Sequence, residues 1–302
     1  MEALEREILY TVQLAHNFNS AFNREQVFYF LKTELSQKEY DDSIDTMLAN
    51  GEIFLKNDLL FVKDLYDSSI IRKNWSRKLF QKYRYYIRLV TFIPWITFVG
   101  LTGRNSFESC NKKDDLDIFI ITESNRLWIT YLLIVLISKL LGIRNILCAN
   151  YLVDEDNLVL GKKSYYTAVQ LMQMVPVYNI NFKEKLVQSN SWIKYYIPNA
   201  DMQNQTIGNY LIKSTRRNRR KYFSKLFDEM NKIIFKKYFR RLNKKYYEII
   251  GGSMILEEGI AKLHRIDHHD IYDDYLQENK INRTVKLPEK SAIRYKKMWR
   301  RI

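Results

Sequence analysis

A strongly apolar run over residues 127–138 limits the folds open to this chain. Its length of about a dozen residues, closed by Lys139, is too short for a membrane span, which takes roughly 20 apolar residues. A helix that is apolar on all sides is one that other layers of the protein cover. We therefore expect a buried helix over residues 128–141, ended by Gly142.

The segments around this run have the composition of β-strands. Residues 95–101, 116–121 and 146–153 are rich in β-branched and aromatic side chains, which strands favour. A polar loop over 102–114 separates the first two, and the apolar helix separates the last two. This order predicts an α/β (α+β) fold, in which a mixed sheet is flanked by helices.

The first 70 residues are expected to form a small unit of their own. Helical spacing over 3–16, a capping Asn23, and the pair Ser36 and Glu39 predict three helices. Two apolar stretches around the polar turn 56–58 then predict a hairpin. Three helices followed by a hairpin describe a winged-helix-like unit, a type of unit that can bind DNA through its third helix.

The third helix of this unit is acidic. It carries Glu39, Asp41, Asp42 and Asp45, and carboxylates repel the phosphates of DNA. The charge therefore favours a packing or dimerisation module, with DNA binding as the alternative.

The rest of the chain divides into a core over residues 71–185 and a basic helical region over 186–302. The core begins with a basic, aromatic helix over 75–93 that Pro94 ends. The net charge is +15, and residues 213–245 alone hold fourteen Lys or Arg against Asp228 and Glu229. Aromatic residues recur between these cations, so we expect a helix with an aromatic inner face and a cationic outer face.

Such a segment attracts polyanions. Its partners can be nucleic acid, nucleotide phosphates or an acidic membrane surface, or the cations can simply be a solvated helix face. Of these, nucleic acid is the candidate partner that we retain for residues 213–245.

Two cysteines, Cys110 and Cys148, are too few for a disulfide framework. The charged first residues also lack the order of a signal peptide. Together with the absence of a membrane span, these features predict a cytoplasmic protein.

The pattern that carries chemistry is a glycine turn followed by two acids. Gly103 follows an apolar strand, and Asp115 and Asp117 open the next one. Side chains two residues apart on a strand point to the same face, so both carboxylates can hold one pair of divalent ions. Mg²⁺ prefers such oxygen ligands together with substrate phosphates, and a glycine turn lets backbone N–H groups approach those phosphates closely.

This order of motifs resembles the polymerase-β-type nucleotidyltransferase superfamily. More closely, it is similar to a bacterial and archaeal group of nucleotidyltransferase-domain proteins. The resemblance is strongest over residues 75–200 and looser over the N-terminal unit and around His264. Its motifs are Thr102-Gly103, Asp115-Leu116-Asp117, Arg126-Leu127-Trp128, Cys148-Ala149-Asn150-Tyr151-Leu152, Tyr166-Thr167-Ala168, Val175-Pro176-Val177-Tyr178, Trp192 and Pro198-Asn199.

The resemblance implies transfer of a nucleoside monophosphate from a nucleoside triphosphate to an acceptor. Asp115 and Asp117 would hold Mg²⁺ or Mn²⁺, and Thr102, Gly103 and Arg104 would seat the triphosphate. Two departures keep a catalytically inactive binding protein as the alternative. Arg104 follows Gly103 where the superfamily usually has Ser or Gly. The third carboxylate usually lies on the neighbouring strand, where this chain has Asn150.

A second group of polar residues lies between His264 and Asp270, with three histidines among them. Histidines and aspartates can bind zinc or iron, but such sites draw ligands from separate elements. A polar loop or helix start is the expectation for this short segment.

Overall fold

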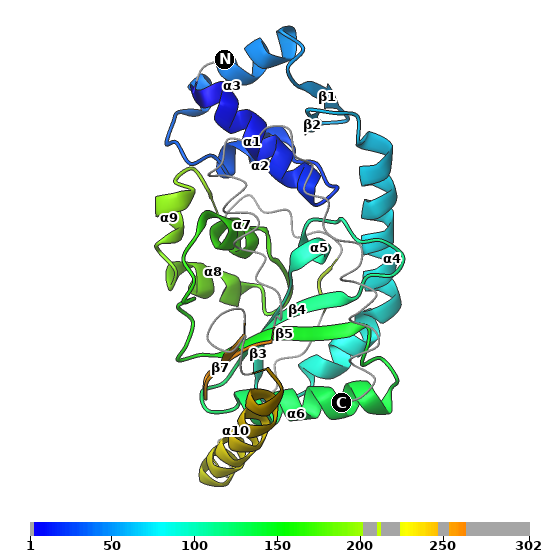
Figure 1. The fold of residues 1–302 in the computed structure, drawn as a ribbon, viewed down its shortest axis with the longest axis vertical. Helices are drawn as coiled ribbons and strands as arrows, with labels where there is room; N and C mark the ends of the chain where they lie inside the picture. Colours follow the sequence, from blue (N-terminus) through cyan, green and yellow to red (C-terminus); the bar gives the residue numbers. More distant parts are fainter. Residues whose placement is uncertain (1–2, 202–209, 213–223, 247–253, 264–302) are drawn as a thin grey trace.

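The computed structural model describes residues 3–201, 210–212, 224–246 and 254–263. They form a mixed α/β protein around a six-stranded sheet with the strand order β6-β3-β4-β5-β8-β7 (Figure 1). The expected fold class is therefore confirmed. The strands of this sheet are β3 (Ile96–Leu101), β4 (Leu116–Thr122), β5 (Leu147–Asp154), β6 (Val175–Tyr178), β7 (Ile255–Leu256) and β8 (Ile260–Lys262).

Strand β4 lies at the centre of the sheet. It pairs antiparallel with β3 and parallel with β5. The connection from β4 to β5 is α6 (Leu127–Leu140), because parallel neighbours need a crossover, usually a helix. The three strands and the apolar helix expected between residues 95 and 153 are thus confirmed.

Several elements, three strands and the short helix over 103–106 among them, were not expected from the sequence. The loop over 102–114 contains the short helix α5 (Gly103–Ser106), and Val175–Tyr178 pairs with β3 as β6. The region beyond residue 207, expected to be mostly helical, contributes β7 and β8. These two strands complete the sheet beside β5. With two and three residues, β7 and β8 are too short to show a periodic sequence pattern. Their place is set by pairing with the otherwise open edge of β5.

The helix α4 (Tyr66–Thr91) begins nine residues earlier than the predicted 75–93 segment. At 1.5 Å per residue its 26 residues span about 39 Å. Figure 1 shows it along one side of the molecule, from the N-terminal hairpin down to the sheet. The buried positions of its first turns are Ser69 and Ser76, so the inward face there has no apolar run that a sequence pattern could detect.

The N-terminal unit contains the three helices and the hairpin that the sequence predicts. They are α1 (Ala3–Asn17), α2 (Arg24–Tyr29), α3 (Gln37–Ala49), β1 (Phe54–Lys56) and β2 (Leu59–Phe61). Capping boxes begin α2 at Asn23 and α3 at Ser36. Asn57 and Asp58 both have positive φ angles, as a two-residue hairpin turn of type I′ requires. Its interpretation as a winged helix stays a prediction.

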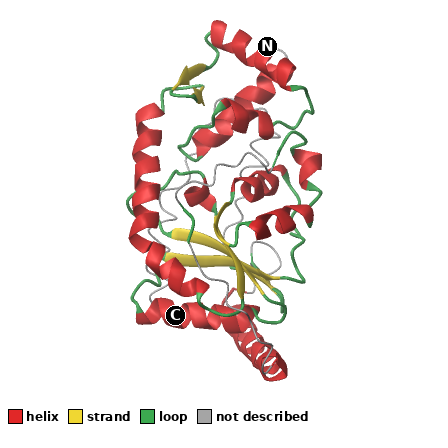
Figure 2. Ribbon diagram, turned by 180° about the vertical axis from the view of Figure 1, so that it is seen from behind, coloured by secondary structure: helices red, strands yellow, loops and turns green. Residues whose placement is uncertain are grey.

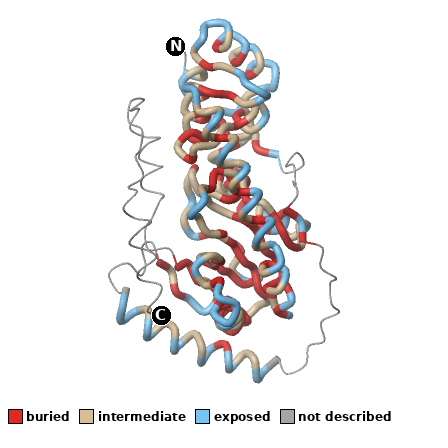
Figure 3. The backbone as a smooth tube through the Cα atoms, turned by 90° about the vertical axis from the view of Figure 1, so that its right-hand side faces the viewer, coloured by how far each residue is buried: buried red, intermediate tan, exposed pale blue. Residues whose placement is uncertain are grey.

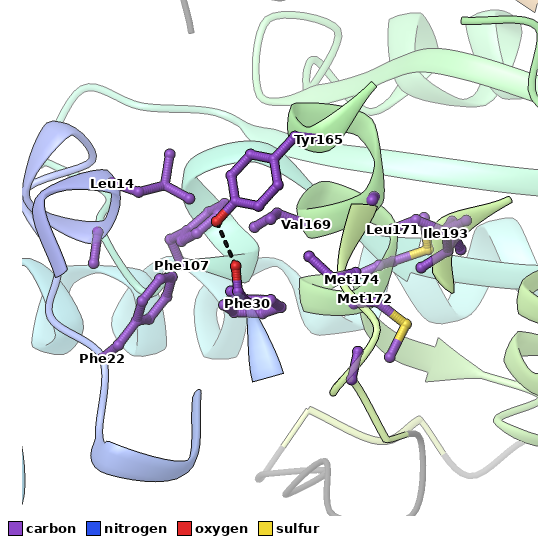
Figure 4. Close-up of a cluster of buried hydrophobic side chains, with 14 of the residues drawn as sticks. Leu14, Phe22, Phe30, Phe107, Tyr165, Val169, Leu171, Met172, Met174 and Ile193 are labelled. Atoms are coloured by element: carbon purple, nitrogen blue, oxygen red, sulfur yellow. Dashed lines mark hydrogen bonds between the residues drawn. The ribbon is translucent and has the colours of Figure 1, made fainter. Parts of the chain in front are cut away.

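Two hydrophobic cores lie on the two faces of the large sheet, which Figure 2 shows between helices. One face carries α4, α6 and α10 (Ser224–Tyr246). The other carries α7 (Tyr165–Gln173), α8 (Asn181–Gln188), α9 (Ile193–Tyr196) and the N-terminal unit, whose core residues are continuous with theirs. In Figure 4 the Tyr165 hydroxyl on α7 donates a hydrogen bond of 2.7 Å to the Phe30 carbonyl of the N-terminal unit.

Among the helices that the structure describes, none has the length and apolar character needed to cross a membrane. The sheet and α10 cover one side of the apolar helix α6, whose buried residues lie mostly in its first half, while Leu136 and Leu140 are exposed, so the expected burial holds only in part.

Candidate active site

The glycine turn lies against the second of the two acids. Strand β3 ends at Leu101, Thr102 is extended, and Gly103 begins α5 with a φ of 57°. The Thr102 N–H donates to the Asp117 carbonyl at 3.0 Å. A Cβ on residue 103 would lie 3.1 Å from the Asp117 Oδ2. Glycine is needed here for its left-handed backbone and for this close approach.

Asp115 and Asp117 lie side by side, as their spacing predicts. Asp115 precedes β4 directly and Asp117 is its second residue, while Leu116 between them points into the core on the α6 side. One carboxylate oxygen from each acid and the Cys148 Sγ all lie within 4.8 Å of one another, and all three residues are half-buried. Three potential ligands from two neighbouring strands therefore meet at one point.

Cys148 is the residue that sequence reasoning missed. On β5 it stands opposite Asp117, and Ala149 stands opposite Ile118. The register then shifts, so that Tyr151 stands opposite Phe119. Asn150 is the extra residue of this β-bulge, and the position beside Asp117 belongs to Cys148. Regular alternation would give Asn150 the same face as Cys148, and the sequence contains no indication of the bulge.

The acids at the end of β5 lie away from this site. Asp154 is the last residue of β5, six residues beyond Cys148. Its carboxylate accepts hydrogen bonds from the Asn125 and Asp156 N–H groups and from the Asn157 side chain. Burial raises the pKa of Asp154 above its usual value, and these hydrogen bonds oppose the rise. Asp154 therefore organises a turn at the opposite end of the strand.

Arg104 forms an ion pair with Asp114, an acid outside the pair of Asp115 and Asp117. Its Nη1 lies 3.2 Å from one carboxylate oxygen of Asp114 and 3.3 Å from the other. The Arg104 side chain is 37% exposed, so solvent weakens this ion pair. Arg104 can bind a phosphate only by exchanging Asp114 for it or by sharing its remaining N–H donors.

The buried side chain of Asn105 fastens α5 to the start of β4. Its Nδ2 donates to the Asp115 carbonyl at 3.0 Å, and its Oδ1 accepts from the Cys110 thiol. Burial raises the pKa of Cys110 to about 12, and the charges of Asp114 and Asp117 act in the same direction. The thiol therefore stays protonated and can donate, which holds the glycine turn and the Asp pair in one arrangement.

Three other predicted features are not among the described parts of the structure. The cluster between His264 and Asp270 lies outside the described residues, as does the 213–223 part of the basic segment. The side chain of Asn150 is likewise not described.

Comparison of the chain with models of known protein families, with curated proteins and with solved structures finds no match in any of the three. The site therefore has to be interpreted from its own residues.

Proposed function

We propose that the protein is a cytoplasmic, metal-dependent nucleotidyltransferase. An acceptor hydroxyl or phosphate oxygen attacks the α-phosphorus of a nucleoside triphosphate. A bond forms from that oxygen to the α-phosphorus, and the bond to the bridging oxygen of the β-phosphate breaks. Pyrophosphate leaves with the electron pair of this bond, and the acceptor proton passes to solvent or to a nearby base.

The observation that carries the proposal is the meeting of Asp115 and Asp117 beside the glycine turn. Their oxygens lie within 4.8 Å of each other, and the Asp117 carboxylate lies against Gly103, at the start of α5. Mg²⁺ is commonly held by one or two carboxylates and by substrate phosphates. The two aspartates fit that ligand set, and Mn²⁺ accepts the same oxygen ligands.

The residues of the site would act by positioning and by charge. Asp115 and Asp117 would bind the ion, which when bound neutralises the phosphate charge that builds up during transfer. The Gly103 backbone N–H, with the Thr102 side chain beside it, would seat the triphosphate, because the Thr102 N–H is already bonded to the Asp117 carbonyl. Cys148 offers sulfur, a poor ligand for Mg²⁺, so it would border the site and two carboxylates would do the binding.

The alternative is a catalytically inactive protein of the same architecture. The position beside Asp117 is occupied by Cys148, which supplies no third carboxylate. Its sulfur is a poorer ligand for Mg²⁺ than the amide oxygen of the Asn150 expected there, so the cysteine favours this inactive alternative more strongly. The partners of an inactive protein would bind to the N-terminal unit, interpreted as a winged helix with a packing or dimerisation role, and to the basic α10.

Isothermal titration calorimetry with each nucleoside triphosphate, with and without Mg²⁺, tests the proposal. We expect binding that needs Mg²⁺ and that falls at least tenfold in Asp117→Asn, because Asn keeps the shape but loses the charge that holds the ion. Asp114→Asn is the matched control, since Asp114 pairs with Arg104 instead. Binding that is equal with and without Mg²⁺, or equal in both variants, would refute the metal site.

A further inference from the structure

Helix α10 is fixed to the body of the protein by polar contacts at its first half. The Asn231 side chain, only 2% exposed, accepts hydrogen bonds from the Trp128 and Ile129 N–H groups at 2.8 and 3.1 Å. Asp228 forms an ion pair with the buried Arg126. These contacts place α10 across the N-terminal end of α6.

Aromatic contacts continue along the same side of α10. Phe235 packs on Trp128 with ring centres 5.4 Å apart, and Tyr238 packs on Tyr131 at the same centroid distance. The aromatic side of the helix is therefore packed on the protein, as the sequence pattern predicted, while Leu226, Met230 and Ile233 in its first half are exposed.

The outer side of α10 is cationic over its second half. In Figure 3 the helix crosses the lower end of the molecule with exposed residues along its length. No Asp or Glu occurs between Met230 and Tyr246. Beyond Lys232, six exposed cations occupy this stretch in two rows of i, i+4 spacing, Lys236-Arg240-Lys244 and Lys237-Arg241-Lys245. Successive members of a row lie about 6 Å apart along the helix axis.

The acids of α10 do not neutralise these rows. Asp228 is paired with Arg126, and Glu229 lies 3.3 Å from Lys232. Both pairs lie in the first nine residues of the helix, before the first cation of either row. Like charges at i, i+4 repel one another, so a bound polyanion would relieve the repulsion within the two rows.

We infer that the second half of α10 binds the phosphate backbone of a nucleic acid. Four of its cations, Lys236, Lys237, Arg240 and Arg241, line an open hollow together with Ile233. The cations would contact successive phosphates, and the exposed Ile233 offers an apolar contact to a base or sugar. This inference concerns binding alone and does not depend on nucleotidyl transfer.

An acidic membrane surface fits the same helix less well. A helix that lies in a membrane interface inserts its apolar face between the lipids. The aromatic face of α10 is packed on α6, its exposed apolar residues Leu226, Met230 and Ile233 all precede the cation rows, and the exposed residues from Lys236 to Lys245 are all cationic or polar. Charge complementarity thus favours a partner whose contact is mainly with phosphates, as with nucleic acid.

The test is fluorescence anisotropy of labelled 20-nucleotide RNA, single-stranded DNA and duplex DNA with the full chain, over a series of salt concentrations. One variant replaces Lys236, Lys237, Arg240 and Arg241 by Gln. The matched control replaces four exposed cations of α4 by Gln, namely Lys78, Lys82, Arg84 and Arg88. Both variants have the same net charge, so overall attraction is equal in the two.

We expect the α10 variant to lose at least tenfold in affinity at low salt and the α4 variant to stay within about twofold of the unchanged protein. For a single strand, four lost phosphate contacts reduce the steepness of log affinity against log salt by about 3. Equal losses in both variants, or no binding by the unchanged protein at low salt, would overturn the inference. Stronger binding to vesicles of anionic lipid than to every nucleic acid, lost in the α10 variant, would identify a membrane instead.

Discussion

At the scale of single residues, Gly103 links the backbone of the candidate site to its chemistry. Replacing it by Ala adds a methyl group 3.1 Å from the Asp117 Oδ2, closer than an ordinary contact. It also forces a side chain into a left-handed backbone, which costs about 1–2 kcal/mol. We predict that Gly103→Ala loses this stability and, in calorimetry, also weakens Mg²⁺-dependent nucleotide binding at least tenfold.

Gly142→Ala is the control for the backbone effect. Gly142 also has a positive φ, 67°, but a Cβ there meets no atom within 4 Å. This variant should lose a similar amount of stability and keep its nucleotide affinity. If both variants bind nucleotide as the unchanged protein does, the turn is not part of the binding site.

His16 makes the stability of the N-terminal unit depend on pH. Its ring is buried, with Nδ1 donating to the Ser20 carbonyl and Nε2 accepting from the Val62 N–H. Burial, with a smaller contribution from the charge of Lys63, lowers the pKa of His16 to about 4, and the hydrogen bond to the Ser20 carbonyl opposes this lowering. The unfolded chain binds the proton near pH 6.5, so the folded state loses stability as the pH falls from 6.5 towards 4.

The expected loss reaches about 3 kcal/mol across that window, at 1.36 kcal/mol for each pKa unit. Urea unfolding of the unchanged protein and of His16→Gln at pH 7.5 and 4.5 measures it. Gln keeps a donor and an acceptor but has no proton to bind, so its stability should change less between the two pH values. An equal change in both proteins would show that His16 does not titrate as described.

The sequence predicts the two aspartates of the site but not the cysteine beside them. Asp115 and Asp117 could be placed together because strand alternation is a local rule. Cys148 reaches Asp117 only through the parallel pairing of β4 with β5 and through the bulge at Asn150. Neither the pairing register nor the bulge has a local pattern in the residues.

At the scale of elements, α6 shows how a helix can be predicted while its cap cannot. Its apolar run indicates the helix from the sequence alone, yet Arg126 at its N-cap position provides no side-chain cap. The cap is Asn231, which lies 103 residues away from Trp128. Only the docking of α10 brings it there, so the sequence pattern of α6 gives no information about it.

Removing this cap should release α10. In Asn231→Leu the Trp128 and Ile129 N–H groups are buried without an acceptor, at a cost of about 1–3 kcal/mol each. We predict a lower melting temperature, and faster hydrogen exchange in α10 than in β3–β5. Asn231→Asp keeps an acceptor at a helix N-terminus, where a negative charge is favourable, and should lose less. Equal losses in the two variants would contradict the capping role.

At the scale of the whole molecule, the N-terminal unit is joined to the candidate site through the loop after α5. Phe107, which follows α5, stacks on Phe18 with ring centres 4.1 Å apart, and the Ser20 hydroxyl donates to the Phe107 carbonyl. The glycine turn therefore has a fixed position relative to both the sheet and the N-terminal unit. This long-range packing is not visible in the sequence, which indicates the unit by its caps and its hairpin only.

The proposed function requires Asp115 and Asp117 to bind the metal ion of a nucleoside triphosphate. Anomalous X-ray scattering from crystals grown with Mn²⁺ and a non-hydrolysable nucleoside triphosphate tests it most directly. We predict a manganese peak within coordination distance of an oxygen of each aspartate, with the phosphates beside Gly103. Nucleotide bound with its metal at any other residues, or no manganese between the two aspartates, would contradict it.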